Sequence, residues 1–166
     1  MKALEWYKKA AVQGSPSAQF AVGAMYLNGF DGVRENNDEA VKWLTKAAEQ
    51  NHREAAKLLG SIYENGVIAP ADQVKSTRWY LQAAKQGDIA SQYAVGMHYL
   101  EGNGVEKDPA KGASWILKAA QQDLPDAQTE MQNLYEEGIG VKRNIKAARF
   151  WKKKAEETAS ELEKAD

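Results

Sequence analysis

The amino-acid sequence predicts an all-α fold, a solenoid of about nine helices built from tandem repeats. The first indication is that all five tryptophans of the 166-residue chain recur at intervals of 36 or 37 residues, as Trp6, Trp43, Trp79, Trp115 and Trp151. An alanine follows each of them four residues later, at Ala10, Ala47, Ala83, Ala119 and Ala155. A tyrosine series keeps the same period, at Tyr26, Tyr63, Tyr99 and Tyr135. A fixed period of this length is typical of helical repeats, in which each unit buries its apolar face against its neighbours.

Each repeat is predicted to contain two helices. The first is exemplified by residues 91–102, where small or apolar residues at i, i+4, i+5 and i+8 follow the helical period. The second is exemplified by residues 108–123, which open with Asp108 and Pro109. This pair is a strong helix start, because the Asp side chain can accept from a free helix amide and proline has no amide to leave unpaired.

The ends of the second helices are marked in a constant register. Seven residues before the tryptophans of the full repeats stand residues that commonly cap a helix N-terminus, namely Asn36, Asp72, Asp108 and Asn144. Eight residues after the first four tryptophans stand residues that tolerate a left-handed conformation, namely Gly14, Asn51, Gly87 and Asp123. The fifth copy has Ala159 at that place, so we expect the last helix to continue beyond it.

These marks divide one solenoid domain into half a repeat and four full repeats. We expect the second helix of an incomplete repeat at 1–14, full repeats at 15–51, 52–87 and 88–123, and a fourth repeat with a C-terminal capping helix at 124–166. The loops within the repeats are rich in glycine, but the second loop has Ile68 where the others have a second glycine, so its shape should differ. The half repeat leaves Trp6 and Tyr7 partly uncovered, which would support end-to-end self-association through this helix.

Composition excludes several classes of function. With 22 basic and 23 acidic side chains the net charge is −1, which gives no electrostatic footprint for nucleic acid or an anionic membrane. The absence of cysteine excludes disulfides, thiolate catalysis and thiolate metal sites. No apolar run approaches the ~20 residues that span a bilayer, and the charged opening MKALEWYKKAAVQG does not fit a signal peptide. We expect a soluble chain, cytoplasmic as sequenced; a periplasmic or secreted location stays open if the natural chain begins further upstream.

The full pattern reads A-x-x-x-x-G-x-x-Y, then G-x-G-V, then D/N-x-x-x-A-x-x-W-x-x-x-A-A-x-x-G. The first full copy carries it at Ala18, Gly23, Tyr26, Ala40, Trp43, Ala47 and Ala48, and the third at Gly96, Tyr99, Gly102, Gly104, Val105, Trp115, Ala119 and Ala120. Over essentially the whole chain this pattern resembles the Sel1-like repeat (SLR), a branch of the tetratricopeptide (TPR) superfamily. The departures are Ser91 for the leading alanine, the altered second loop, and Gln132 for the glycine of the last repeat.

The resemblance implies a right-handed superhelix whose concave face is built mainly by the first helices of the repeats. Members of the family act as adaptors, assembly factors, host-interaction proteins or toxin-neutralising immunity proteins. The best-known bacterial subgroup has a disulfide in each repeat and a suggested penicillin binding. This chain has no cysteine, so the properties of that subgroup are not expected of it.

The conspicuous residues of the repeat are interpreted as packing devices. Alanine lets a neighbouring helix approach closely and tryptophan fills the space beside it. Two histidines without a nucleophile or orienting acid give neither a catalytic group nor a metal site; His52, at the start of a helix, is expected to be solvated. We therefore expect no enzyme activity and no catalytic, cofactor-binding or metal-binding residues.

The candidate partner-binding surface rests on the resemblance. In tetratricopeptide-like units the groove is lined by the residue before the leading alanine and by those 2, 6, 9 and 10 after it. From these positions we select Phe20, Leu27, Glu54, Lys57, Glu64, Tyr93, Met97, Glu101, Asp126, Glu136 and Glu137. Six are acidic and only Lys57 is basic, which would focus a negative potential in the groove. Solvation of an exposed helix face is the alternative interpretation of these charges.

The sequence thus favours a non-enzymatic scaffold or adaptor that binds a peptide or loop of a partner protein, one that is basic and carries an apolar anchor. An immunity or inhibitor protein that neutralises a cognate bacterial toxin enzyme is the first alternative. A hydrolase or small-molecule binder is the second, and a screen for turnover with His98→Ala would test it.

Overall fold

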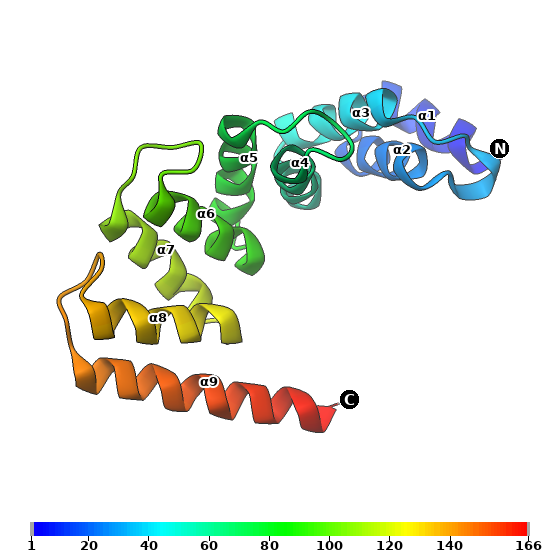
Figure 1. The fold of residues 1–166 in the computed structure, drawn as a ribbon. Coiled ribbons are helices and arrows are strands. Elements are labelled where there is room, and N and C mark those ends of the chain that lie inside the picture. Colours follow the sequence, from blue (N-terminus) through cyan, green and yellow to red (C-terminus); the bar gives the residue numbers. More distant parts are fainter. Residues whose placement is uncertain (1, 166) are drawn as a thin grey trace. The chain divides into compact units, whose positions relative to one another are not determined.

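The computed structural model describes residues 2–165, and every regular element in that range is a helix (Figure 1). In chain order the described elements are α1 (Lys2–Val12), α2 (Pro16–Asn28), the 3-10 turn η1 (Phe30–Gly32), α3 (Asn37–Glu49), α4 (Arg53–Asn65), α5 (Gln73–Lys85), α6 (Ile89–Glu101), α7 (Pro109–Ala120), α8 (Pro125–Glu137) and α9 (Ile145–Ala165). The predicted all-α repeat architecture is confirmed. None of these helices combines the length and the apolar character needed to cross a bilayer.

The chain divides into two compact units, Met1–Gln86 and Gly87–Asp166. The first unit holds α1–α5 and is centred on a cluster around Leu44, Leu59 and Trp79, with a smaller cluster around Trp43. The second unit holds α6–α9 and has its own cluster around Ile116 and Met131. Each unit therefore buries its own apolar core, as stacked helical repeats require.

The helix ends follow the predicted register. Each of four side chains accepts a hydrogen bond from the backbone amide three residues ahead, at 3.0–3.1 Å: Asn36, Asp72, Asp108 and Asn144. The residues that follow the second helices α1, α3, α5 and α7 have positive φ, at Gly14 (95°), Asn51 (63°), Gly87 (89°) and Asp123 (60°). The last helix runs on past Ala159, as expected.

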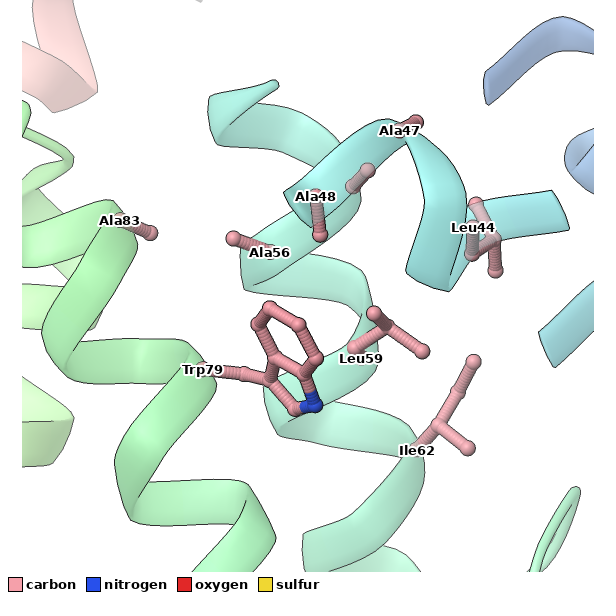
Figure 2. Packing of buried hydrophobic residues seen from close by; sticks show 9 residues of the cluster. Leu44, Ala47, Ala48, Ala56, Leu59, Ile62, Trp79 and Ala83 are labelled. Atoms are coloured by element: carbon pink, nitrogen blue, oxygen red, sulfur yellow. The ribbon is translucent and has the colours of Figure 1, made fainter. Parts of the chain in front are cut away.

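Trp43, Trp79 and Trp151 are buried in the cores of their units, and Trp115 is half-buried. Trp79 of α5 points onto α4, between Ala56 and Leu59, and toward Ala48 of α3 (Figure 2). It is 5 % exposed, and Trp43 in the same place of the preceding repeat is 8 % exposed. Trp6 is 70 % exposed, because no described helix stands where α4 stands for Trp79. The uncovered face predicted for the half repeat is confirmed.

Glycine allows the two helices of a repeat to approach closely. A Cβ added to Gly23 would lie 2.8 Å from Cγ of Leu44, and one added to Gly60 would lie 2.6 Å from the ring of Tyr80. At Gly96 it would overlap Ile116 and the backbone of α7. At these three glycines the lack of a side chain therefore lets the two helices of a repeat come into direct contact.

Buried glutamines connect consecutive repeats, a feature that the sequence analysis missed. Gln19 Nε2 donates to the Ala11 carbonyl at the end of α1 (3.1 Å), and its Oε1 accepts from Gln50 Nε2 (2.7 Å). In the second unit, the same two bonds occur as Gln128 to the Ala120 carbonyl (3.2 Å) and Gln122 to Gln92 Oε1 (2.7 Å). The second repeat has Ala56 in place of the glutamine, and there Gln82 of α5 donates to the Ala48 carbonyl. These bonds satisfy carbonyls that a helix end leaves open.

We predict that Gly96→Ala destabilises the second unit. Alanine gains about 1 kcal/mol over glycine in helix propensity, but overpacking against Ile116 and the backbone of α7 should cost more, for a net loss of about 1–3 kcal/mol. Urea unfolding measures this free energy. Ser114→Ala, on the exposed side of α7, is the control and should change stability by less than about 0.5 kcal/mol. A Gly96→Ala chain as stable as the wild type would contradict the close approach.

Candidate functional site

In the first unit an aromatic contact joins α2 to the residue that caps the start of α4. The rings of Phe20 and His52 stack with centroids 4.8 Å apart and an angle of 19° between their planes. His52 also caps α4, because its Nδ1 accepts from the Ala55 amide (3.3 Å). The expectation that His52 is solvated was wrong: its side chain is only 16 % exposed, because Phe20 covers it. One face of Phe20 is accordingly occupied within the chain.

The two acidic candidates of the first unit have partners within that unit. Glu54 accepts from Arg53 (2.8 Å), and the pKa of its carboxyl is lowered, first by this bond and then by a backbone hydrogen bond. Glu64 Oε2 accepts from the Tyr80 hydroxyl (2.8 Å). Lys57 is half-buried on the same helix. The negative charge of this part of the predicted groove is therefore largely engaged.

In the second unit, α6 and α8 bring an aromatic ring and carboxylates together. Tyr93 and Met97 of α6 are half-buried and pack against the edge of the core. The pKa of the Tyr93 hydroxyl is raised, first by burial and then by the negative charges of Glu130, Asp126 and Glu101. Carboxylates of both α6 and α8 thus lie near enough to disfavour the phenolate, which makes this the acidic part of the surface.

The remaining acidic candidates lie at the C-terminal end of α8. Glu136 and Glu137 are both exposed, and Glu136 Oε1 accepts from Gln132 Nε2 (3.0 Å). Across the described range, no lysine or arginine lies within ion-pair distance of Glu101, Asp126 or Glu137. The second unit therefore presents uncompensated negative charge on α6 and α8, the first helices of its two repeats.

Glu130 is a residue that the sequence analysis did not select. It lies three residues after the leading Ala127, a place outside the groove positions taken from the resemblance. The structure brings its charge near Tyr93, where, after burial, it is the largest cause of the raised pKa. The available signal was that Glu130 lies one helical turn after Asp126, at i and i+4, so both face one side of α8.

The other conspicuous titratable residue is His98, which is 3 % exposed on α6. Burial keeps it away from any ligand on the surface. In the part of the chain that the structure describes, no group of three His, Asp or Glu side chains is arranged to hold a metal ion.

The family model of the Sel1 repeat matches this chain five times, at residues 1–15, 16–52, 53–88, 89–124 and 125–157. No curated protein matches the sequence. Among solved structures, c5321, a protective antigen present in uropathogenic Escherichia coli strains and displaying an SLR fold, is 37% identical with a TM-score of 0.82, over 93% of this chain and 33% of that one. A Sel1 repeat protein from Oxalobacter formigenes is 37% identical with a TM-score of 0.79, over 99% of this chain and 49% of its own.

The immunity protein PA5088 from Pseudomonas aeruginosa is 19% identical with a TM-score of 0.51, over 95% of this chain and 73% of that one. At this identity the likeness concerns the fold only. The chain spans about a third and about half of the lengths of the two structures with 37% identity.

We predict that the Tyr93 hydroxyl deprotonates at a higher pH than a tyrosine ordinarily does. Burial and three nearby carboxylates both disfavour the phenolate, so the pKa of Tyr93 is raised and its neutral form persists further into alkaline solution. Glu130→Gln should lower the pKa of Tyr93, and added salt should do so too. NMR of ring-labelled tyrosine, assigned with Tyr93→Phe, measures it, and Glu106→Gln is the exposed control. An unchanged pKa in Glu130→Gln would contradict the arrangement.

Proposed function

The chain belongs to the Sel1 repeat family, whose members are protein-interaction scaffolds, and we propose that it is a non-enzymatic scaffold that binds a basic segment of a partner protein. The binding surface that we propose is the outward face of α6 and α8 in the second unit. The candidate residues of the first unit were selected from the same set of positions in the repeat.

The observation that carries this proposal is the group of carboxylates around Tyr93. Glu101, Asp126 and Glu130 all act on its hydroxyl, and the first two have no ion-pair partner within the described chain. A lysine or arginine side chain placed here would gain charge-assisted hydrogen bonds and could stack on the ring. Bringing such a cation in would also relieve the mutual repulsion of the carboxylates.

An apolar contact beside these charges favours a polypeptide over a small cation. Met97 is a half-buried, adaptable side chain one turn beyond Tyr93 on α6. Aromatic residues and methionine are typical of the energetically dominant positions in protein interfaces. We therefore expect the partner segment to combine basic residues with an apolar anchor. The likeness to PA5088 shows the fold alone and does not favour an inhibitory role.

We predict that short random peptides selected on the immobilised chain will be enriched in lysine and arginine. The double variant Glu101→Lys, Asp126→Lys should weaken binding of the selected peptides by about tenfold or more, because attraction becomes repulsion. The wild-type affinity should fall with added salt, and the variant should show little of that dependence. Fluorescence anisotropy measures both.

The matched control is Glu157→Lys with Glu161→Lys, which reverses two exposed charges of α9 and gives the same net charge. Loss of affinity in the control as large as in the test variant would reduce the effect to net charge. Selected peptides without any enrichment in basic residues would overturn the proposal.

Self-association through α1 stays a prediction. Trp6 (70 % exposed) and Tyr7 (45 % exposed) support it, because contiguous exposed apolar surface commonly marks a site of protein–protein contact. If it occurs, the mass measured by sedimentation should rise with concentration, and Trp6→Ser should abolish the rise. A wild-type chain that stays monomeric at every concentration would contradict it.

A further inference from the structure

The segment that contains the first half of α9 is strongly basic, and the proposed function does not use it. Residues 138–155 include seven lysines and arginines and no aspartate or glutamate, whereas residues 88–137 include nine acidic and three basic residues. Both segments belong to the second unit, so the charges of this unit are separated along the chain. All seven basic side chains are exposed, and within the described range only Lys153 forms an ion pair, with Glu157 of its own helix (3.4 Å).

An exposed phenylalanine lies among these charges. Phe150 is 55 % exposed, with Lys146 four residues before it and Lys153 and Lys154 three and four residues after it, so all three lysines neighbour it on the helix surface. Its ring meets the ring of the buried Trp151 at 79°, with centroids 5.2 Å apart, and is thereby held beside the core. Lys146, Arg149, Phe150, Lys153 and Lys154 together form the basic face of α9.

The packing of the repeat does not account for an apolar residue at this place. The corresponding residues of the other four copies are polar or charged, namely Glu5, Lys42, Arg78 and Ser114. Phe150 is therefore a departure from the repeat on an exposed side of its helix, where a large apolar side chain gains from a partner and not from the core.

The charges beside Phe150 are also a departure from the repeat. Arg149 and Lys153 stand at the places of Ala113 and Leu117 in α7, which belong to the core of the second unit. On α9 both positions are exposed. A lysine or arginine in a contact needs an opposite charge, because it loses its hydration there. This face therefore fits a partner that brings carboxylates, and it does not fit another apolar helix.

We propose that the basic face of α9 in one copy of the chain binds the acidic surface of α6 and α8 in a second copy. This inference rests on the proposed function and names a second copy as a basic partner with an apolar anchor. Within the described part of one chain, no ion pair joins α9 to α6 or α8. The opposite charges of the second unit therefore become paired only when another copy supplies them.

The two surfaces present their charges at matching intervals. On α8, Asp126 and Glu130 are four residues apart, and on α9 Arg149 and Lys153 are four residues apart. This spacing corresponds to roughly 6 Å along a helix axis, so two helices side by side can form both pairs at once. Hydrogen bonds between such groups are stronger than neutral ones.

The acidic surface also offers a place for the phenylalanine. Tyr93 and Met97 are half-buried and lie one turn apart on α6, beside the carboxylates. An aromatic ring makes favourable contacts with another ring and with a methionine sulfur. In the proposed contact Phe150 packs against these two side chains and loses its exposure to water.

Two charge-reversed chains test the contact by complementation. One carries Arg149→Glu with Lys153→Glu on the basic face, and the other carries Glu101→Lys with Asp126→Lys on the acidic surface. Neither should bind a copy of itself, because like charges meet, but each retains the surface that the other lacks. The mixture should therefore bind at least about tenfold more tightly than either variant binds itself. Fluorescence anisotropy of one labelled chain at low ionic strength measures this.

The contact must be separated from any association through α1. All chains in this experiment carry Trp6→Ser, which removes the most exposed aromatic side chain of α1. Added salt should abolish the binding of the mixture, because the contact is ionic, whereas an apolar contact through α1 persists in salt. Measurements of association through α1 alone therefore belong in added salt.

Matched variants distinguish the site from net charge and from exposed apolar surface. Arg34→Glu with Lys85→Glu reverses two exposed charges of the first unit and should bind the wild-type chain as before. Phe150→Ser, which introduces the residue found in α7, should weaken self-association by about threefold or more, and Phe30→Ser, at a phenylalanine that is 66 % exposed in the first unit, should not. Circular dichroism checks the folding of each variant.

The outcomes separate the two proposals. If selected basic peptides bind the acidic surface and the mixture binds no more tightly than each variant alone, a second copy is not the partner and the proposed function stands. If the mixture binds and basic peptides do not, the contact between copies stands and the more general proposed function is overturned. If neither binds, both are overturned. Unchanged self-association in Phe150→Ser would contradict the anchor.

Discussion

The close approach of helices at residues with little or no side chain is the constraint on which the rest of this structure depends. A Cβ at Gly60 would enter the ring of Tyr80, and the paired alanines Ala47 and Ala48 are fully buried beneath the next helices. Close-packed interiors do not absorb even one extra methyl without strain. These close contacts at glycine and alanine therefore fix the spacing of each helix pair. They also fix which side of the first helix of each repeat faces solvent.

Side-chain hydrogen bonds between consecutive repeats add to these close contacts. The glutamine that follows the leading small residue reaches back to the last carbonyls of the preceding helix, as Gln19 does to Ala11. Where the second repeat has Ala56 instead, Gln82 donates to the equivalent carbonyl from a different helix. The carbonyl has to be satisfied because it is buried, but the side chain that satisfies it can come from either neighbour. This explains why the glutamine is not a fixed part of the repeat pattern.

The backbone features were predictable from the sequence to the residue, and the side-chain environments were not. Caps such as Asp108 and left-handed closures such as Asn51 depend on local chemistry that a single position reveals. The stacking of His52 on Phe20 joins two residues that are 32 positions apart in the chain, and nothing in the sequence around His52 indicates it. Likewise the role of Glu130 beside Tyr93 needs the register of α8 against α6, which the repeat period alone does not supply.

The separation of buried packing residues from exposed residues explains how repeats of the same fold can differ in surface charge. The residues that set the packing, such as Gly96 and Ala120, are buried and tolerate no change of size. The positions on the other side of the same helices do not enter these close contacts, so Asn65 and Glu137 can stand at equivalent places without altering the fold. Binding preference can therefore change one exposed position at a time while stability is retained.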